Sequence, residues 1–440
     1  MKLEKLYLDC KKMKLFFKII IIGVFFIGSD IANANTLLDS LQSAYLNNPK
    51  LNAERANMRA SKEEKREAVS EFLPSVTISG YRSEQDNTKG KSSDSNFEPQ
   101  ENSMLIEQKI FQGFGGVANL QKKRKGQKLG EFKLKKIEQE ILLEAAKVHT
   151  EFLLNVKKVD INLTNIELLE RQVETDQNRL EKGEISLTDL AQSEASLAGA
   201  RAELIAAEND LITSKANFEK IIGKKPTNNI KKVANINLNL PTSLAEAYKI
   251  SNSENPNLRI AELEYEQSKL DVTIAGSELS PSATLSYKIA EQDNLSSTVQ
   301  ERTQQTVTAT ATWPLFAGGK NAFNYRKFQE IKNQKELLFE DEKKTVQTEV
   351  ANAWSNYQSS KSVLDSIRSQ VKAAEIANEG ITLEYESGTG RTTLEVIQSR
   401  TILLNSRLNL ANSERNLLIS RFDLMSSVGR LTAQQLKLKK

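Results

Sequence analysis

The sequence predicts a mainly α-helical protein with a transmembrane β part, built as a duplicated unit in which helices flank a strand hairpin. Three observations support this fold class. The chain repeats itself along most of its length, each repeat holds two short segments of alternating polarity, and each contains a long proline-free stretch followed by heptads. Alternation with a period of two is typical of strands, whereas heptads indicate coiled coils.

The internal duplication is visible from the tetrapeptide EQDN, which occurs at 84–87 and again 207 positions later at 291–294. The same shift pairs Asn48-Pro49 with Asn255-Pro256. A shift of 205 aligns IFQGFGG (110–116) with LFAGG (315–319). A register that holds this far indicates two structural repeats, for which we expect the bounds 35–226 and 227–440.

Residues 1–34 have the features of a secretory signal peptide. Lysines precede an apolar run at 15–27, and Ala32-Asn33-Ala34 supplies small residues for cleavage. Whether translation begins at Met1 or at Met13 is left open. The only cysteine, Cys10, precedes the apolar run, so we expect an exported chain without disulfides or a lipid-anchored cysteine.

The composition argues against an enzyme and against a nucleic-acid partner. The whole chain carries a net charge of +4, and residues 1–34 hold six lysines and three acids, which leaves the rest near +1. The single histidine, His149, is expected to be a half-buried packing residue, because a metal site needs further ligands. We therefore expect no metal and no cofactor. Only 39% of the residues are hydrophobic, which favours long helices with narrow apolar seams.

The elements follow the same order in both repeats. A short helix ends at the Asn-Pro pair, a second runs to about Glu71 (Glu278 in the copy), and Pro74 or Pro281 closes it. Strands are then expected at 75–86 and 103–112, separated by a polar loop over 88–102. The copy predicts strands at 282–293 and 305–316, with a polar loop over 295–304. Each strand has roughly the length that crosses a membrane when tilted.

Long helices follow the strands, at 117–182 and 321–387, and each would be on the order of 100 Å long at 1.5 Å per residue. Turns at Gly183 and Gly388 send the chain back into return helices at 188–222 and 393–428. These helices carry apolar residues every seven positions, with small residues between them: Leu190, Leu197, Leu204, Leu211 and Phe218, then Val396, Leu403, Leu410, Leu417 and Leu424. Such seams predict closely packed antiparallel coiled coils.

Aromatic residues gather where the strands end: Phe111, Phe114, Trp313, Phe316 and Phe323. Ordinary core packing is one explanation. An interfacial girdle is the other, and the polar loops at the opposite ends of the strands favour it, together with contact to outer-membrane lipid.

Four transmembrane strands cannot close a barrel, and an open edge in lipid leaves backbone groups unpaired. Two copies would give eight strands, whose side chains nearly fill the barrel, whereas three would give twelve and leave a lumen. We therefore expect a homotrimer with a twelve-stranded β-barrel. Its long helices would continue the barrel as an α-helical, coiled-coil cylinder in the periplasm.

The chain resembles the TolC-like outer-membrane efflux proteins. The resemblance rests on the duplicated Asn-Pro helices, on IFQGFGG and LFAGG, and on the turn motifs RLEKGEISLTDLAQSEASL and EYESGTGRTTLEVIQSRTIL. It implies a trimeric duct in the outer membrane that extends into the periplasm and meets a periplasmic adaptor (membrane fusion) protein and an inner-membrane transporter. Such a duct serves a tripartite efflux pump or a type I secretion system, and exports small toxic molecules or polypeptides without catalysis.

Alternatives from other classes remain open at this point. A soluble periplasmic coiled-coil scaffold would make the strands a mere surface hairpin. An enzyme would need a clustered polar site, which the sequence lacks. The basic run KKRKGQK (122–128) begins a long helix, so a solvated helix face explains it better than nucleic-acid binding, with contact to anionic lipid next.

The resemblance also implies functional residues at the helix turns. We expect Gly183, Leu187 and Gly388 to form exposed tips that dock the adaptor, since they lie a full helix length from the strands. These glycines are also expected to be helix C-caps.

In the resembled family an acid in the first turn, bonded to an arginine and a tyrosine in the second, holds a gate closed. The matching residues are Asp189, Arg391 and Tyr385, followed inside by Glu395 and by Gln398 where a second acid is usual. Capping boxes at 186–189 and 392–395 are an equally good account of the two acids.

Overall fold

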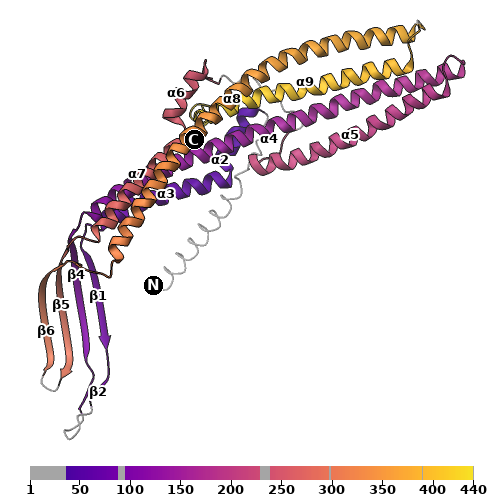
Figure 1. Ribbon diagram of the computed structural model, residues 1–440. Helices are drawn as coiled ribbons and strands as arrows, with labels where there is room; N and C mark the ends of the chain where they lie inside the picture. Colours follow the sequence, from indigo (N-terminus) through magenta and orange to yellow (C-terminus); the bar gives the residue numbers. More distant parts are fainter. Residues whose placement is uncertain (1–35, 88–94, 228–237, 297–298, 389, 440) are drawn as a thin grey trace, which may run out of the picture.

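The computed structural model describes residues 36–87, 95–227, 238–296, 299–388 and 390–439. The expected signal peptide, with Cys10, lies outside these residues. Figure 1 shows an elongated molecule with strands at one end and the turns of two helical hairpins at the other. Within the described ranges, no helix is both long enough and apolar enough to span a membrane.

The two repeats have the same order of elements, except that the short strands β2 and β3 occur only in the first. The first contains α2 (Leu37–Asn47), α3 (Pro49–Ser70), β1 (Ser75–Arg82), β2 (Gln85–Asn87), β3 (Ser95–Phe97), β4 (Gln100–Gln112), α4 (Gly115–Glu181) and α5 (Leu187–Ile222). The second contains α6 (Leu244–Glu254), α7 (Pro256–Ser277), β5 (Ser282–Ser296), β6 (Val299–Thr312), α8 (Lys320–Glu386) and α9 (Thr393–Ser427).

The Asn-Pro pairs start the second helix of each repeat. The side chain of Asn48 accepts hydrogen bonds from the backbone N–H groups of Lys50 and Leu51, at 3.0 and 3.3 Å. Asn255 caps α7 in the same way. Proline follows each cap at the first helical position, where its missing N–H costs no hydrogen bond.

The four long strands form one antiparallel sheet in the order β1-β4-β5-β6. Apolar side chains from neighbouring strands share one face: Val76 pairs with Ile106, Ile106 with Tyr287, and Tyr287 with Val307. Thr77, Ser79 and Lys288 belong to the opposite face, because side chains alternate along a strand. β1 and β6 are the two edges.

Several strand bounds are predicted wrongly. The strand expected at 75–86 ends at Arg82, and β4 begins at Gln100 and not at 103. β6 begins at Val299 and not at 305, so the predicted loop at 295–304 is largely strand. Polar residues mislead there, because this part of β6 is polar on both faces, with Glu301 and Thr303 on one and Arg302 and Gln304 on the other. β6 ends at Thr312 and not at 316, since Pro314 has no N–H to donate. The EQDN word does not end β5, which continues to Ser296.

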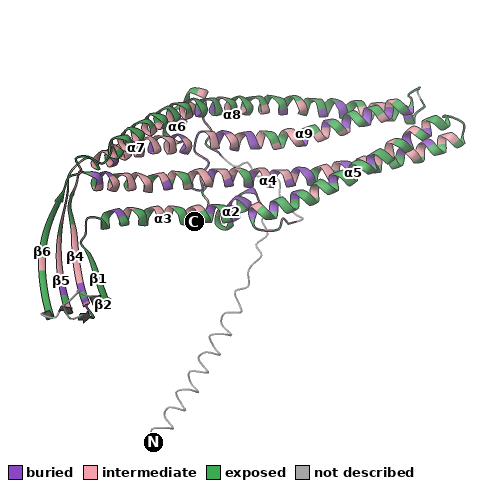
Figure 2. Cartoon of the chain, turned by 60° about the horizontal axis from the view of Figure 1, so that its bottom comes forward, coloured by how far each residue is buried: buried purple, intermediate pink, exposed green. Residues whose placement is uncertain are grey.

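The helices lie side by side in a row that changes members along the molecule. Nearest the sheet, α4 packs between α3 and α7, and α7 packs against α8. Farther away, α4 packs between α5 and α9, and α9 packs against α8. The two 67-residue helices α4 and α8 run through both halves. Figure 2 shows that much of the helical surface is exposed or only partly buried in a single chain.

The main core lies midway along the molecule, where α2 and the C-terminal segment pack against α4 and α5. Leu41, Leu142, Phe218 and Phe422 are fully buried there. His149 lies in the same core and is fully buried, so its prediction as half-buried is wrong. Its Nδ1 is 2.8 Å from Ser40 Oγ, and Nε2 has no hydrogen-bond partner. Burial lowers the pKa of His149 to about 4, and the charge of Asp39 opposes this only partly.

This core predicts acid sensitivity. His149 binds a proton more readily in the unfolded chain, near its usual pKa of 6.5, than in the folded one, near 4. Stability is therefore full above pH 6.5 and falls as the pH drops toward 4. Between pH 7 and 4.5 we expect a loss of roughly 2 to 3 kcal/mol. Urea unfolding followed by helical circular dichroism would measure it.

The control is His149→Leu, which removes the titrating group. Its unfolding free energy should be lower at pH 7, because Ser40 loses its partner, but should change less with pH than that of the parent. Identical pH slopes for the two proteins would contradict the assignment.

Candidate functional site at the distal turns

The turns between α4 and α5 (182–187) and between α8 and α9 (387–392) lie at the end of the molecule opposite the sheet (Figure 1). We call them the distal turns. Gly183 and Gly388 adopt left-handed backbone angles, with φ of +72° and +74°. No atom lies within 4 Å of a Cβ built on either glycine, and Leu187 is 70% exposed. The distal turns are therefore accessible surfaces.

Each distal turn leads into a capped helix. Asp189 accepts hydrogen bonds from the backbone N–H and the hydroxyl of Ser186, at 2.9 and 2.7 Å, which completes a capping box. The hydroxyl of Ser186, followed by its N–H, lowers the pKa of Asp189. Thr392 and Glu395 form the matching box at α9. Both acids thus act first on their own helix.

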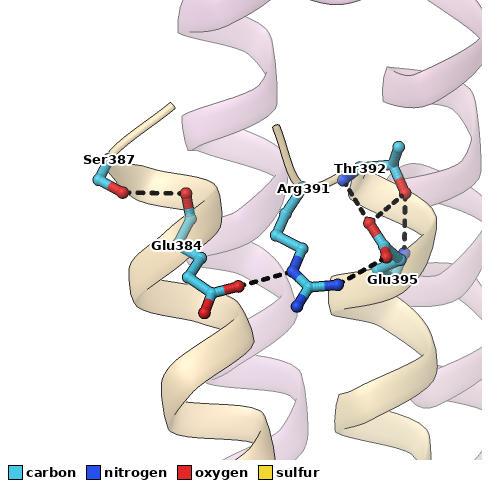
Figure 3. Close-up of polar contacts among 5 residues, drawn as sticks. All are labelled: Glu384, Ser387, Arg391, Thr392 and Glu395. Carbon is cyan, nitrogen blue, oxygen red and sulfur yellow. Dashed lines mark hydrogen bonds and ion pairs between the residues drawn. The ribbon is translucent and has the colours of Figure 1, made fainter. Parts of the chain in front are cut away.

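Arg391 links the two helices that flank the second distal turn (Figure 3). Its Nε donates to Glu384 on α8 at 2.6 Å, and its Nη1 donates to Glu395 on α9 at 3.0 Å. The hydroxyl of Ser387 donates to the carbonyl of Glu384 at 3.0 Å. These contacts fix the shape of the α8–α9 turn with exposed charges.

A buried cluster lies just behind the turns and joins both repeats. The carboxylate of Asp176 on α4 is fully buried and accepts from the hydroxyl of Tyr385 on α8 at 2.6 Å. It also accepts from Gln172 at 2.8 Å and from the hydroxyl of Ser193 on α5. Tyr385 lies 3.0 Å from the hydroxyl of Thr393. We call these five residues the Asp176 cluster.

Two arginines border the Asp176 cluster. The guanidinium of Arg179 stacks 4.4 Å from the centre of the Tyr385 ring, and it donates to the Tyr385 carbonyl at 3.2 Å. Arg400 is buried on α9 and donates to the carbonyl of Leu168 at 2.9 Å. Burial lowers the pKa of Arg400, and burial together with the Asp176 bond raises the pKa of Tyr385.

The structure does not bring the expected gate residues together within one chain. In the described part of the protomer, Asp189 bonds to neither Arg391 nor Tyr385, so the expected gate contact is not formed within one chain and stays a prediction. Its carboxylate is engaged by the cap, Arg391 is held by two nearer glutamates, and Tyr385 reaches Asp176. Gln398 is exposed on α9, one turn beyond Glu395.

Sequence reasoning missed Asp176, although a signal was present. Buried residues recur every seven positions along α4, at Asn155, Asn162, Leu169 and Asp176. The acid therefore occupies a seam position of the coiled coil, opposite Ser193 on α5. A charged residue at a seam position needs hydrogen-bond donors from the facing helices. Extending the heptad pattern into α4 would therefore have identified Asp176 as a candidate.

The aromatic residues expected at a girdle lie where the sheet meets α4 and α8. Phe114, Trp313, Phe316 and Phe323 are 61% to 87% exposed, and Phe111 is 38% exposed. They are therefore not core residues of the single chain. Trp313 Nε1 donates to the carbonyl of Leu279 at 3.1 Å.

The basic run on α4 is largely neutralised by acids of the neighbouring helices. Lys122 pairs with Asp271 at 2.5 Å, Lys125 with Glu266 at 2.5 Å and Lys123 with Glu64 at 2.8 Å. These pairs support the helix-face explanation. Over the described residues, no group of three or more His, Cys, Asp or Glu side chains is arranged to hold a metal ion.

Comparisons with known proteins also match the chain in two parts. The family model described as outer membrane efflux protein matches residues 40–224 and again 247–430. The chain is 25% identical to outer membrane efflux protein BepC of Brucella suis, over 92% of this chain and 88% of that protein. It is 24% identical to outer membrane protein TolC of Escherichia coli, over 95% and 87%. The Campylobacter jejuni CmeC outer membrane channel has a similar fold, with a TM-score of 0.81 at 14% identity, over 92% and 87%.

The Asp176 cluster predicts different costs for two small substitutions. Tyr385→Phe removes one hydroxyl and leaves a buried carboxylate short of a donor, so the free energy of unfolding should fall by about 1–3 kcal/mol. Asp189→Asn changes an exposed cap and should cost less than about 0.5 kcal/mol. Urea unfolding of both variants measures the difference. Equal losses of unfolding free energy in the two variants would mean that the hydrogen bond from Tyr385 to Asp176 does not stabilise the fold.

Proposed function

The chain belongs to the outer membrane efflux protein family, and we propose that three copies assemble into one continuous conduit. As a member of this family it is an outer-membrane channel of tripartite efflux systems that extends into the periplasm. It is not an enzyme, and the alternative of a soluble periplasmic scaffold is set aside.

The open edges of the sheet carry the proposal of a trimer. In the described chain β1 and β6 each pair on one side only, so each leaves a row of backbone N–H and C=O groups unpaired. In lipid every such group costs several kcal/mol, and only another strand can satisfy the whole row. Pairing β6 of one copy with β1 of the next closes the sheet. Twelve strands leave an open lumen, whereas eight would be nearly filled by side chains.

The two faces of the sheet suit lipid and water. The apolar face carries large side chains that remain exposed in the single chain, at Val76, Ile78 and Val307. The opposite face bears Lys288, which pairs with Glu101 at 2.6 Å, and a row of threonines on β6. The first face meets acyl chains and the second lines the lumen, while Trp313 and Phe316 lie at the membrane interface.

The helical row continues the conduit. α5 lies at one end of the distal row and α8 at the other, so each meets the next copy. Both keep large apolar residues exposed: Ile205 and Ile212 are 67% and 65% exposed on α5, and Ile376 and Leu383 are 65% and 59% exposed on α8. Burying these residues between copies closes a cylinder of twelve helices.

The distal turns dock a periplasmic adaptor protein, which links the conduit to an inner-membrane transporter. They are the surfaces farthest from the membrane, and Leu187 offers an exposed apolar contact. The open space around Gly183 and Gly388 lets a partner backbone approach closely.

Bulky side chains at these glycines separate docking from capping. Gly183→Trp and Gly388→Trp fill the open space, so cross-linking to the adaptor and export should both fall at least tenfold while the trimer stays intact. The matched controls are Gly183→Ala and Gly388→Ala, which impose the same backbone strain without the bulk. If the tryptophan and alanine variants show the same cross-linking to the adaptor and the same export, the adaptor docks elsewhere on the protein.

The gate lies between copies. Asp189 starts α5 at the end of the helical row, so the nearest second distal turn beyond it belongs to the next copy. Arg391 is tied to Glu384 and Glu395 with exposed side chains, and it can exchange one of these partners for Asp189 of the neighbour. Glu395 and Gln398 follow along the lumen, with one carboxylate per copy at this level.

Single-channel conductance in planar bilayers tests both the duct and the gate. The purified protein should form channels. Arg391→Ser should raise their conductance, because the distal turns lose the ion pair between Arg391 and Asp189 of the next copy that holds the gate closed. Arg201→Ser breaks a matched ion pair with Glu170 within one coiled coil and should leave conductance unchanged. Absence of channels would reject the conduit, whereas channels unaffected by Arg391→Ser would reject the gate alone.

A further inference from the structure

The duplication relates side-chain contacts as well as sequence. A shift of 207 carries β1 and α3 onto β5 and α7, and a shift of about 205 carries β4 and α4 onto β6 and α8. The register of Ser75 with Glu107 then becomes that of Ser282 with Thr312, which is observed. The hydrogen bond from Asn119 to Glu71, 3.0 Å, becomes that from Asn324 to Glu278, 3.1 Å.

The relation also holds in the distal half. The ion pair of Arg201 with Glu170 joins α5 to α4 at 2.9 Å, and the pair of Arg407 with Glu375 joins α9 to α8 at 2.9 Å. Three kinds of contact, along the whole length of the molecule, thus follow one correspondence between the repeats, in which positions are shifted by about 205 to 207. We call this correspondence the operator. The operator can also be applied to an open seam, a helix surface that the single chain leaves without a packing partner.

That open seam lies beside the membrane-proximal half of α8. Within the chain, α4 packs on one side against α3 and on the other against α7. α8 packs against α7 in the way that α4 packs against α3. Apart from α6 and α9, which meet α8 farther from the sheet, no other helix of the described residues packs closely against it. The operator maps α4 onto α8 and maps α7 onto α3 of the next copy. It therefore places α3 of the next copy against α8, as α7 lies against α4.

The charges on the two surfaces fit this placement. Lys122 and Asp271, paired across the α4–α7 seam, map onto Lys327 and Glu64. Lys125 and Glu266, paired one turn farther, map onto Glu330 and Arg59, a pair of opposite polarity. In both mapped pairs a cation faces an acid. In the second pair, however, the acid lies on α8 and the cation on α3, the reverse of the pair inside the chain.

The cations and acids concerned are available. Arg59, Lys327 and Glu330 are exposed, and none of the three has an ion pair in the part of the chain that the structure describes. Glu64 pairs with Lys123 at 2.8 Å, and its carboxylate keeps acceptor capacity for a second cation. One position departs from the duplication, because Lys320 replaces Gly115, which lies against Ser277. In a seam between copies, the longer side chain of Lys320 would keep the start of α8 farther from its neighbour than Gly115 keeps α4 from α7.

We propose that the membrane-proximal seam between copies is formed by α8 of one copy and α3 of the next, joined by Glu330 with Arg59 and by Lys327 with Glu64. This inference rests on the proposed trimer and assigns its contact surface. The sign exchange between the two pairs means that α3 matches α8 only at the one register in which both pairs form. Repeated three times around the ring, the pairs select that register when the barrel closes.

Disulfide trapping tests the seam directly. Cys10 is the only cysteine of the sequence, so residues 36–440 provide a cysteine-free background. Arg59→Cys combined with Glu330→Cys should give covalent dimers and trimers on non-reducing gels of oxidised membranes. The control combines Ser61→Cys with Glu330→Cys, because Ser61 lies against Gly130 of its own chain and not toward a neighbour. The control should stay monomeric on the same gels.

Charge reversal tests the pairing itself. Glu330→Arg places two cations at the seam and should raise the monomer fraction in dilute detergent by about tenfold, summed over three seams. Arg59→Glu alone should act likewise, and the double variant Arg59→Glu with Glu330→Arg should restore the parental fraction. Native mass spectrometry measures the fractions.

The possible outcomes distinguish this inference from the proposed function. Trapping at Arg59 and Glu330 with rescue by the double variant supports the seam. Intact trimers without trapping or rescue overturn the seam and leave the conduit standing. A parental protein that stays monomeric in the membrane overturns both.

Discussion

Unpaired backbone groups at the two edges of the four-stranded sheet set the requirement that the proposed assembly has to meet. Lipid cannot satisfy the N–H and C=O groups of β1 and β6, and this is the physical reason for the proposed trimer. In that trimer the chain is one third of a conduit, and its outer surfaces are contacts between subunits. This explains why large apolar residues such as Val307, Ile205 and Phe316 remain exposed in a molecule with a modest hydrophobic content.

The helices meet a different requirement in the proposed conduit, because they stay together at the far end while the proposed gate between copies opens. The buried Asp176 cluster ties α4, α5 and α8 of one copy with hydrogen bonds that cost much to break. The distal turns beyond it carry exposed caps and the exposed pairs of Arg391, which cost little. The buried hydrogen bonds thus hold the helices of one copy together, whereas the exposed ion pairs at the distal turns can rearrange at little cost.

Internal duplication connects these two levels. In the proposed ring of three chains, each seam inside the chain has a counterpart between copies, so one helix-hairpin-helix unit supplies six similar positions. Contacts such as Asn119 with Glu71 and Asn324 with Glu278 were kept in both repeats. At the seams the repeats have diverged, as the exchange of Lys125 for Glu330 shows. Divergence of this kind lets neighbouring repeats differ while the ring still closes.

The duplication, the long helices and their heptad seams can be read from the amino-acid sequence, because period, length and proline positions are local properties of the chain. The same holds for the capping boxes at Asp189 and Glu395. The full extent of β6, the burial of His149 and the partners of Tyr385 and Arg391 depend on contacts between segments far apart in the chain. Asp176 and Tyr385 are 209 residues apart, and their hydrogen bond exists because packing brings α4 and α8 to the same end of the molecule. No local pattern specifies which of two acids, Asp176 or Asp189, lies within reach of that hydroxyl.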